Sequence, residues 1–272
     1  MSAALLGLLA AAGPVAATGA ADEPSPADGV LVPTYEAART PEDQQVKAFL
    51  SQNHVLEGIA DYAAERVKLP QDVPLHATSC GEPNAFWLPA SQDITFCYEL
   101  FTAIKPLLAE HEPGDTEQER SEELDKDLIG VTNSFILHEL GHALVSLYDI
   151  PVIGQEEDAA DQFAALLLNS GDEQHVAYSV STIYSYGVLA DAEEQGQRPI
   201  EAYADEHSLH AQRYYNWACW LYGSDTARYA TLQLAEGNPN GILPPDRANR
   251  CPGEYQQIEK AWGPYLEPYV RS

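Results

Sequence analysis

The chain has 272 residues, and its 42 acidic residues outweigh 14 Lys and Arg to give a formal net charge of −28 at pH 7. The acids are spread along the sequence without a basic patch, which argues against nucleic acid and anionic membranes as partners. The length is sufficient for a large hydrophobic core, in one domain or in two tightly joined lobes.

The first 21 residues have the composition of a cleavable export signal. Residues 3–21 carry no charge, are rich in Ala and Leu, and end in small residues that suit a signal peptidase. No Lys or Arg precedes this run, so the charged start of an ordinary signal is missing, and Pro14 disfavours a stable membrane anchor. We expect a signal peptide at 1–21, a flexible acidic and Pro-rich segment at 22–40, and a single main domain at 41–272.

Ahead of residue 100, the pattern predicts one helix and two short strands. Apolar residues recur at helical spacing from Gln44 to Val67, after a proline at position 41. Strand signals cover Pro74 to Thr78 and Ile94 to Tyr98, the second with alternating apolar and polar residues. Gly and Pro residues interrupt the segment between the two strands.

The four cysteines are Cys80, Cys97, Cys219 and Cys251, and none belongs to a Cys-x-x-Cys pair. An even number of cysteines fits disulfide bonding in an exported protein, so we expect a secreted or periplasmic location. Three pairings are possible, and proximity in the sequence favours Cys80–Cys97 and Cys219–Cys251. The alternative is four buried free thiols in a cytosolic protein.

The most informative stretch is His138-Glu139-Leu140-Gly141-His142, which lies in a long helical pattern. Residues i and i+4 share one face of a helix, so both imidazoles can reach a single Zn²⁺ at about 2.0–2.1 Å, with Glu139 beside the bound water. Apolar residues at alternating +3 and +4 steps precede the two histidines, so this part of the helix is predicted to be buried. The alternative is a pair of core histidines bonded to neighbours. A metal explains the pair better, because buried imidazoles without partners are costly.

A third metal ligand is predicted on the next helix. A turn at 149–154 ends the first helix, and 156–168 reads as a second helix that begins with three acids. Glu157 and Asp161 are again i and i+4, so Glu157 can complete a two-histidine, one-glutamate site while Asp161 orients a ligand histidine. Glu156, Asp158 and Asp161 remain alternative ligands, and the acids of the first turn could instead complement the helix dipole.

The chain is predicted to be mainly helical from Asp115 to Ala235. A loop rich in Pro and Gly follows from Gly237 to Pro252, and one more helix covers about Tyr255 to Trp262. The fold class is therefore α+β, mainly helical, with a small β-sheet or hairpin.

The zinc motifs resemble those of known metallopeptidases. His-Glu-x-x-His followed by Glu-x-x-x-Asp is similar to the gluzincins, although in thermolysin the Glu follows the second His at a greater distance. Glu-x-x-Ala-Asp-x-Phe-Ala also resembles the ImmA/IrrE-type metallopeptidases. More closely, the chain resembles a family of secreted bacterial metallopeptidases known only as a domain of unknown function. The segments that carry this last resemblance are Cys80–Phe86, Phe96–Glu99, both zinc segments, Glu206–Leu209 and Arg213–Asn216.

The resemblance implies a zincin-like fold that binds one Zn²⁺ per chain and hydrolyses a peptide or protein substrate. It also implies a small sheet whose edge strand holds the substrate, for which Ile94–Glu99 is the candidate. Three protein ligands leave a position for water, and Glu139 would act on that water as general base.

A second group that stabilises the developing oxyanion is expected on a later helix. His207, His210 and Tyr214 lie there at +3 and +4 steps, with Arg213 beside them. We take His207 as the candidate catalytic residue, and each of the four can equally be a surface or packing residue.

The alternative function is a non-catalytic, secreted zinc-binding or structural protein. A structural zinc site normally closes its fourth position with a protein ligand. No fourth Cys or His lies close in sequence, which favours catalysis.

Overall fold

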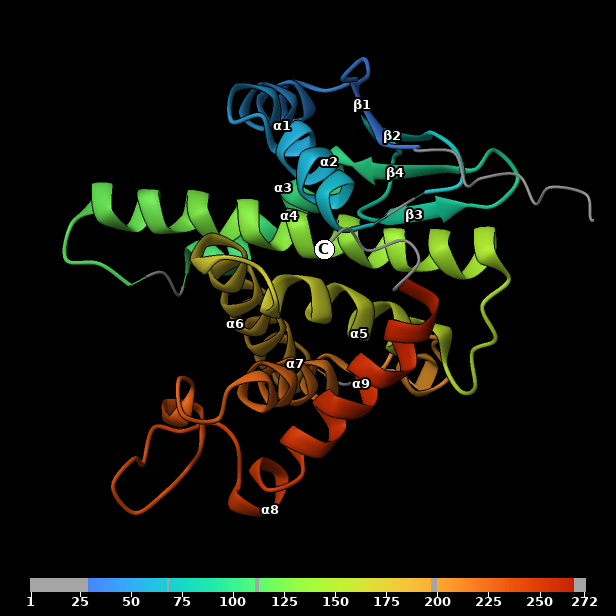
Figure 1. Ribbon diagram of the computed structural model, residues 1–272. Coiled ribbons are helices and arrows are strands. Elements are labelled where there is room, and N and C mark those ends of the chain that lie inside the picture. Colours follow the sequence, from blue (N-terminus) through green and yellow to red (C-terminus); the bar gives the residue numbers. More distant parts are fainter. Residues whose placement is uncertain (1–28, 68, 111–112, 197–199, 267–272) are drawn as a thin grey trace, which may run out of the picture.

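The computed structural model describes residues 29–67, 69–110, 113–196 and 200–266 (Figure 1). Within these ranges the chain is mainly helical and contains one four-stranded sheet, so the predicted α+β class is confirmed. None of the helices in these ranges is long and apolar enough to cross a membrane. The predicted signal peptide at 1–21 lies outside the described residues.

The sheet has the strand order β1-β2-β4-β3. Strands β1 (Leu31–Tyr35), β2 (Val73–Thr78) and β4 (Asp93–Cys97) are parallel, and β3 (Ala85–Leu88) runs antiparallel to β4. The expectation that Ile94–Glu99 forms the edge strand is wrong, because β4 is interior and every one of its residues is buried. The edge next to the central helix is β3, which the sequence did not predict.

The folded domain begins earlier than expected. Strand β1 lies within the segment 22–40 that was predicted to be flexible, and it pairs with β2 over five residues. Residues 22–28 lie outside the described part of the chain.

The helix predicted over Gln44–Val67 is two helices. Helix α1 (Pro41–Gln52) starts at a capping box in which Thr40 and Asp43 bond each other's backbone, and α2 (Val55–Arg66) follows. They are separated at His54, whose φ of 50° is left-handed and ends a run of α-helical residues. A single left-handed residue leaves no mark on the periodicity of apolar residues, so the pattern reads as continuous.

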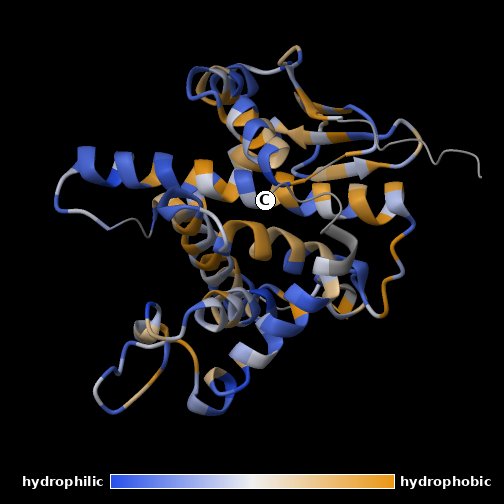
Figure 2. Ribbon diagram, viewed as in Figure 1, coloured by the Kyte–Doolittle hydropathy of each residue, from blue (hydrophilic) through white to orange (hydrophobic). Residues whose placement is uncertain are grey.

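Helix α4 (Glu117–Tyr148) crosses the middle of the molecule, between the sheet with α1–α3 on one side and α5–α9 on the other (Figure 1). Its N-terminal turns are hydrophilic, whereas apolar and polar residues alternate along its second half (Figure 2). Leu137, Leu140 and Leu144 in that half are fully buried. The end of α4 that carries the two motif histidines therefore lies in the core.

The remaining helices pack around α4 and α5. Helix α3 (Tyr98–Ala109) follows β4 directly, and α5 (Glu156–Asn169) matches the second predicted zinc helix. The chain then forms α6 (Glu173–Gln195), η1 (Ile200–Tyr203), α7 (His210–Ser224), η2 (Ala230–Leu232), α8 (Pro245–Ala248) and α9 (Cys251–Leu266).

Both predicted disulfides form, and all four cysteines are paired. Cys80–Cys97 closes a loop that contains the whole of β3, and Glu99 accepts the backbone N–H groups of Cys80 and Gly81 at its entrance. Cys219–Cys251 joins α7 to α9.

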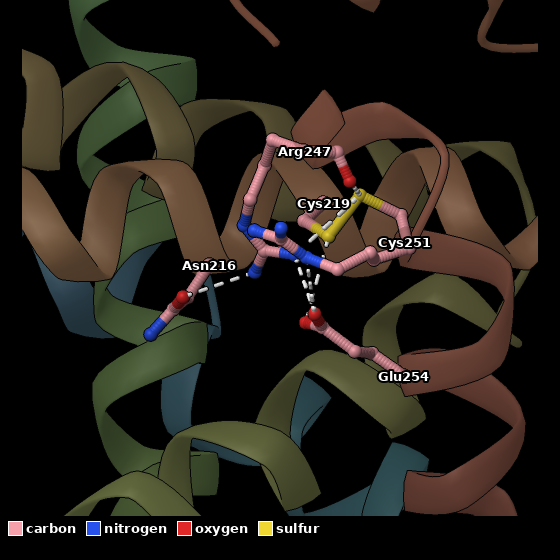
Figure 3. The surroundings of a disulfide bond; sticks show 6 residues. Asn216, Cys219, Arg247, Cys251 and Glu254 are labelled. Atoms are coloured by element: carbon pink, nitrogen blue, oxygen red, sulfur yellow. Dashed lines mark hydrogen bonds and ion pairs between the residues drawn. A yellow bond between two sulfur atoms is a disulfide. The ribbon is translucent and has the colours of Figure 1, made fainter. Parts of the chain in front are cut away.

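Figure 3 shows the second bridge beside Arg247, whose guanidinium donates to Glu254 at 2.7 Å and to Asn216 at 3.2 Å. These polar contacts link the same two helices as the sulfur atoms. The first bridge therefore restrains the edge strand, and the second restrains the helix packing.

Loss of the two bridges should have different consequences. Replacing Cys219 and Cys251 by Ser should lower the free energy of unfolding by about 3–4 kcal/mol, because the closed loop restricts the unfolded chain. Replacing Cys80 and Cys97 should also release β3, and it should lower the affinity for ligands that contact this strand under conditions where the variant is fully folded. Urea unfolding and ligand titration of both double variants test this, and equal losses of affinity in the two would contradict it.

Candidate metal centre

Three side chains from two helices meet in the core of the molecule. His138 and His142 come from α4 and Glu157 comes from the first turn of α5. Glu157 Oε2 lies 3.0 Å from His138 Nε2 and 3.3 Å from His142 Nε2, and the two Nε2 atoms are 3.2 Å apart. The ligand atoms of all three lie within 4.8 Å of one another, so they form a group that could hold one metal ion.

Carboxylates on α5 hold the outer nitrogens of both rings. His138 Nδ1 lies 2.9 Å from Asp161 Oδ1, and His142 Nδ1 lies 2.9 Å from Glu156 Oε1. An ionised carboxylate can only accept, so each Nδ1 donates and each Nε2 is left to face the group. This arrangement of carboxylate, imidazole and metal is the usual support of a histidine ligand.

Asp161 is itself held by a buried arginine. Arg213 of α7 donates from Nε to Asp161 Oδ2 at 2.7 Å and from Nη2 to Oδ1 at 2.6 Å. Its guanidinium also lies over the Tyr186 ring, 4.4 Å from the centroid. This two-point contact keeps Asp161 ionised and fixes its orientation, so a residue on α7 determines how His138 points.

A third imidazole reaches the same carboxylate. His207 Nε2 lies 2.9 Å from Glu157 Oε2, and its side chain is 39% exposed. Its main-chain N–H and its Nδ1 both bond Asp205 Oδ1, which directs Nε2 toward the metal group. His207, a candidate from the sequence, therefore contacts the metal group through Glu157.

Glu139 is not part of the donor group but lies beside it. It is 8% exposed, and its Oε2 accepts the backbone N–H of Trp87 on β3 at 2.7 Å. The bond joins the residue between the two histidines to the edge strand. Because α4 turns Glu139 toward the sheet, its carboxylate faces the space between α4 and β3.

These side chains line one cleft of about 860 Å³. Strand β3 and the turn before it form one side, and residues of α3, α4, α6, the first turn of α5 and the segment 202–213 form the rest. A cleft of this size can enclose several residues of an extended peptide or a ligand of similar volume.

The carboxylates change how the imidazoles bind protons. Burial disfavours the charged ring of His142, but hydrogen bonds to Glu157 and Glu156 outweigh it and raise its pKa to about 9. The pKa of His138 is raised in the same way, against burial, by Asp161 and Glu157. Burial also opposes the charged forms of Glu157 and Asp161, yet the histidines and, at Asp161, Arg213 hold the pKa of both carboxyls well below the usual range.

The donors fit a bound divalent cation. Two Nε2 atoms 3.2 Å apart cannot both point hydrogens at each other, whereas a cation between them and Glu157 satisfies all three at once. Imidazole nitrogen and carboxylate oxygen are the ligands of mononuclear zinc sites.

Four of the predicted site residues lie together. His138, His142 and Glu157 converge, and Asp161 bonds His138. The alternative ligands Glu156 and Asp158 point elsewhere, Glu156 to His142 and Asp158 to Ser208. Each ring nitrogen of the two histidines also has a carboxylate partner, as the alternative of histidines bonded to neighbours requires.

Among the other oxyanion candidates, His210 bonds Glu193 at the wall of the cleft, and Tyr214 packs against Gly187 away from the lining. The sequence did not predict the contact of Trp87 with Glu139 or that of Arg213 with Asp161. Neither contact has a signal in residue spacing, because each joins segments about 50 residues apart.

Two histidines and a glutamate on neighbouring helices, with a further glutamate between the histidines and an open cleft, define a metallopeptidase-type centre. A sequence profile of the domain of unknown function described as “Putative metallopeptidase” matches residues 35–266, and the chain belongs to this family. Searches among curated proteins and among solved structures found no match.

Metal binding should release protons. With a pKa of about 9, the His142 ring carries protons on both nitrogens at pH 7 in the metal-free protein. An incoming ion must displace the proton on the nitrogen that binds it. The apparent affinity for Zn²⁺ should therefore increase as the pH rises, until it levels off above about pH 9. Calorimetric titration in buffers of different ionisation enthalpy should measure at least one proton released per ion, and a release of zero would contradict the account.

Proposed function

We propose that the protein is a zinc-dependent peptidase that uses Glu139 as its general base. The observation that carries the proposal is the position of Glu139, which lies between the metal group and the free edge of β3 in a shared cleft. Membership of the metallopeptidase family supports the same reading. His138, His142 and Glu157 would hold the zinc ion.

Strand β3 is the surface on which an extended substrate would lie. One of its edges pairs with β4 and the other faces the cleft, where Ala85, Phe86 and Trp87 are among the lining residues. An extended peptide can add to such an edge through backbone hydrogen bonds. The Trp87 N–H is already used by Glu139, so the remaining backbone groups of β3 would align the scissile bond beside that carboxylate.

The chain's own residues then move the proton. Zinc bound at this point would act as a Lewis acid and would lower the pKa of bound water to about 7. Glu139 accepts the proton of the attacking water and returns it to the amine that leaves. The Trp87 N–H keeps the carboxylate in place for both transfers. His207 is oriented by Asp205, and its Nε2 lies 2.9 Å from Glu157 Oε2. From this position its Nε2–H would donate to the substrate oxygen as negative charge develops.

Export is part of the proposal. Disulfides such as these two are stable in an oxidising compartment and uncommon in the cytosol. Together with the apolar composition of residues 1–21, they support a secreted or periplasmic peptidase.

A second candidate function has one observation in its favour. His207 Nε2 approaches Glu157 as closely as the two motif histidines do. If His207 is a fourth zinc ligand, the site is closed and the protein is a non-catalytic zinc-binding protein. The two functions differ in what His207 does, so they can be separated by one residue.

Glu139→Gln should abolish peptide hydrolysis while zinc stays bound. The amide oxygen can still accept the Trp87 N–H, but it cannot take a proton, so kcat should fall by about 10²–10⁴-fold. The measurement is turnover of a mixed peptide library together with zinc content per chain. Loss of zinc in this variant would make Glu139 a ligand and refute its proposed role.

His207→Ala separates catalysis from a closed site. As a catalytic residue, its loss should lower kcat by about 10²–10³-fold and leave zinc affinity close to that of the unaltered protein. His142→Ala is the matched control, because it removes an imidazole that we assign as a ligand. Equal losses of zinc affinity in the two variants would favour the closed, non-catalytic site.

A further inference from the structure

The lining of the cleft combines two kinds of side chain. The apolar ones on α3, α4 and α6 are Leu100, Ala103, Ile104, Leu107, Phe135 and Leu189. Besides Glu139 and Glu157, the acidic ones are Glu156, Glu193, Asp205 and Glu206.

The acidic side chains of the lining have almost no Lys or Arg beside them. Among the described residues that line the cleft, Arg213 is the one Lys or Arg, and both of its donating nitrogens bond Asp161. Three of the four additional carboxylates bond an imidazole, Glu156 that of His142, Asp205 that of His207 and Glu193 that of His210. These three are fixed as supports of neighbouring side chains.

Glu206 differs from the other three. It is exposed, and in the described ranges no hydrogen bond or ion pair involves its carboxylate. Glu206 directly precedes His207 in the sequence, and His207 Nε2 lies 2.9 Å from Glu157 Oε2. An unpaired carboxylate therefore lies on the lining of the cleft, on the residue next to His207.

A second feature indicates that the cleft is built for a polar ligand. The hydroxyl of Tyr186 has no hydrogen-bond partner among the described residues, and it is not fully buried although the residue as a whole is only 1% exposed. It therefore opens to the cleft that Tyr186 lines, where it can donate to a ligand atom. A peptide supplies such atoms in its carbonyl groups.

We propose that the cleft selects cationic peptides, with the side chain of a Lys or Arg next to the scissile bond paired to Glu206. This inference rests on the proposed peptidase function and specifies its substrate class. Glu156, Glu193 and Asp205 add to the negative field around that side chain, and the net charge of −28 attracts cationic peptides from solution. An acidic side chain at the same position meets like charge and is rejected.

The test measures binding separately from turnover. Three peptides of one sequence carry arginine, citrulline or glutamate beside the scissile bond, so that the first two differ in charge and hardly in shape. Their affinities for the zinc-loaded Glu139→Gln protein are measured by fluorescence anisotropy. Arginine should bind about 10-fold more tightly than citrulline, glutamate should bind most weakly, and the advantage of arginine should shrink as salt is added.

Two variants separate Glu206 from the general charge of the protein. Glu206→Gln should remove most of the preference for arginine over citrulline. Glu194→Gln is the matched control, because Glu194 is exposed on α6, lies outside the cleft lining and loses the same charge. It should keep the preference.

Equal losses of the preference in the two variants would overturn the role of Glu206, because net charge alone would then explain the selectivity. Equal binding of arginine and citrulline peptides would overturn the inference altogether. A protein that cleaves peptides without favouring arginine refutes the inference and leaves the peptidase function standing. A protein that binds arginine peptides best but cleaves none refutes the peptidase function and leaves the charge selection standing.

Discussion

The close contact of α4 with α5 at Gly141 is the constraint on which the metal group depends. A Cβ atom at Gly141 would lie 3.0 Å from the Cα of Ala160, so any larger residue would force the two helices apart by a few tenths of an ångström. Ala160 lies between Glu157 and Asp161 on α5, which are the residues that meet His138. The glycine of the His-Glu-x-x-His motif therefore helps to set the distance between His138 and Glu157.

The contacts around this pair come from the rest of the chain. Arg213 on α7 holds Asp161, and Trp87 on β3 holds Glu139, so one helix and one strand orient the two parts of the site, the candidate metal group and the carboxylate of Glu139. Each of these elements is restrained by a disulfide. Cys80–Cys97 encloses β3, and Cys219–Cys251 ties α7 to α9, which makes the supporting elements less free to move than their lengths alone would allow.

Local spacing made part of the site predictable. His138, His142, Glu157 and Asp161 follow helical periodicity, and proximity in sequence suggested both disulfides. The sequence predicts the edge strand at Ile94–Glu99 and not at β3. Alternating apolar and polar residues indicate a strand, but they do not indicate its place in the sheet. Trp87 and Arg213 were missed as partners since their contacts depend on tertiary packing. The break at His54 was missed because one left-handed residue does not disturb apolar periodicity.

The central claim is that His138, His142 and Glu157 together hold one zinc ion and leave a position open. X-ray absorption at the zinc edge, on protein loaded with one equivalent, tests it most directly. The account predicts two imidazole nitrogens and oxygen ligands at about 2.0–2.2 Å, and a changed spectrum when a small hydroxamate is added. Three imidazoles with a spectrum that the hydroxamate leaves unchanged would contradict it.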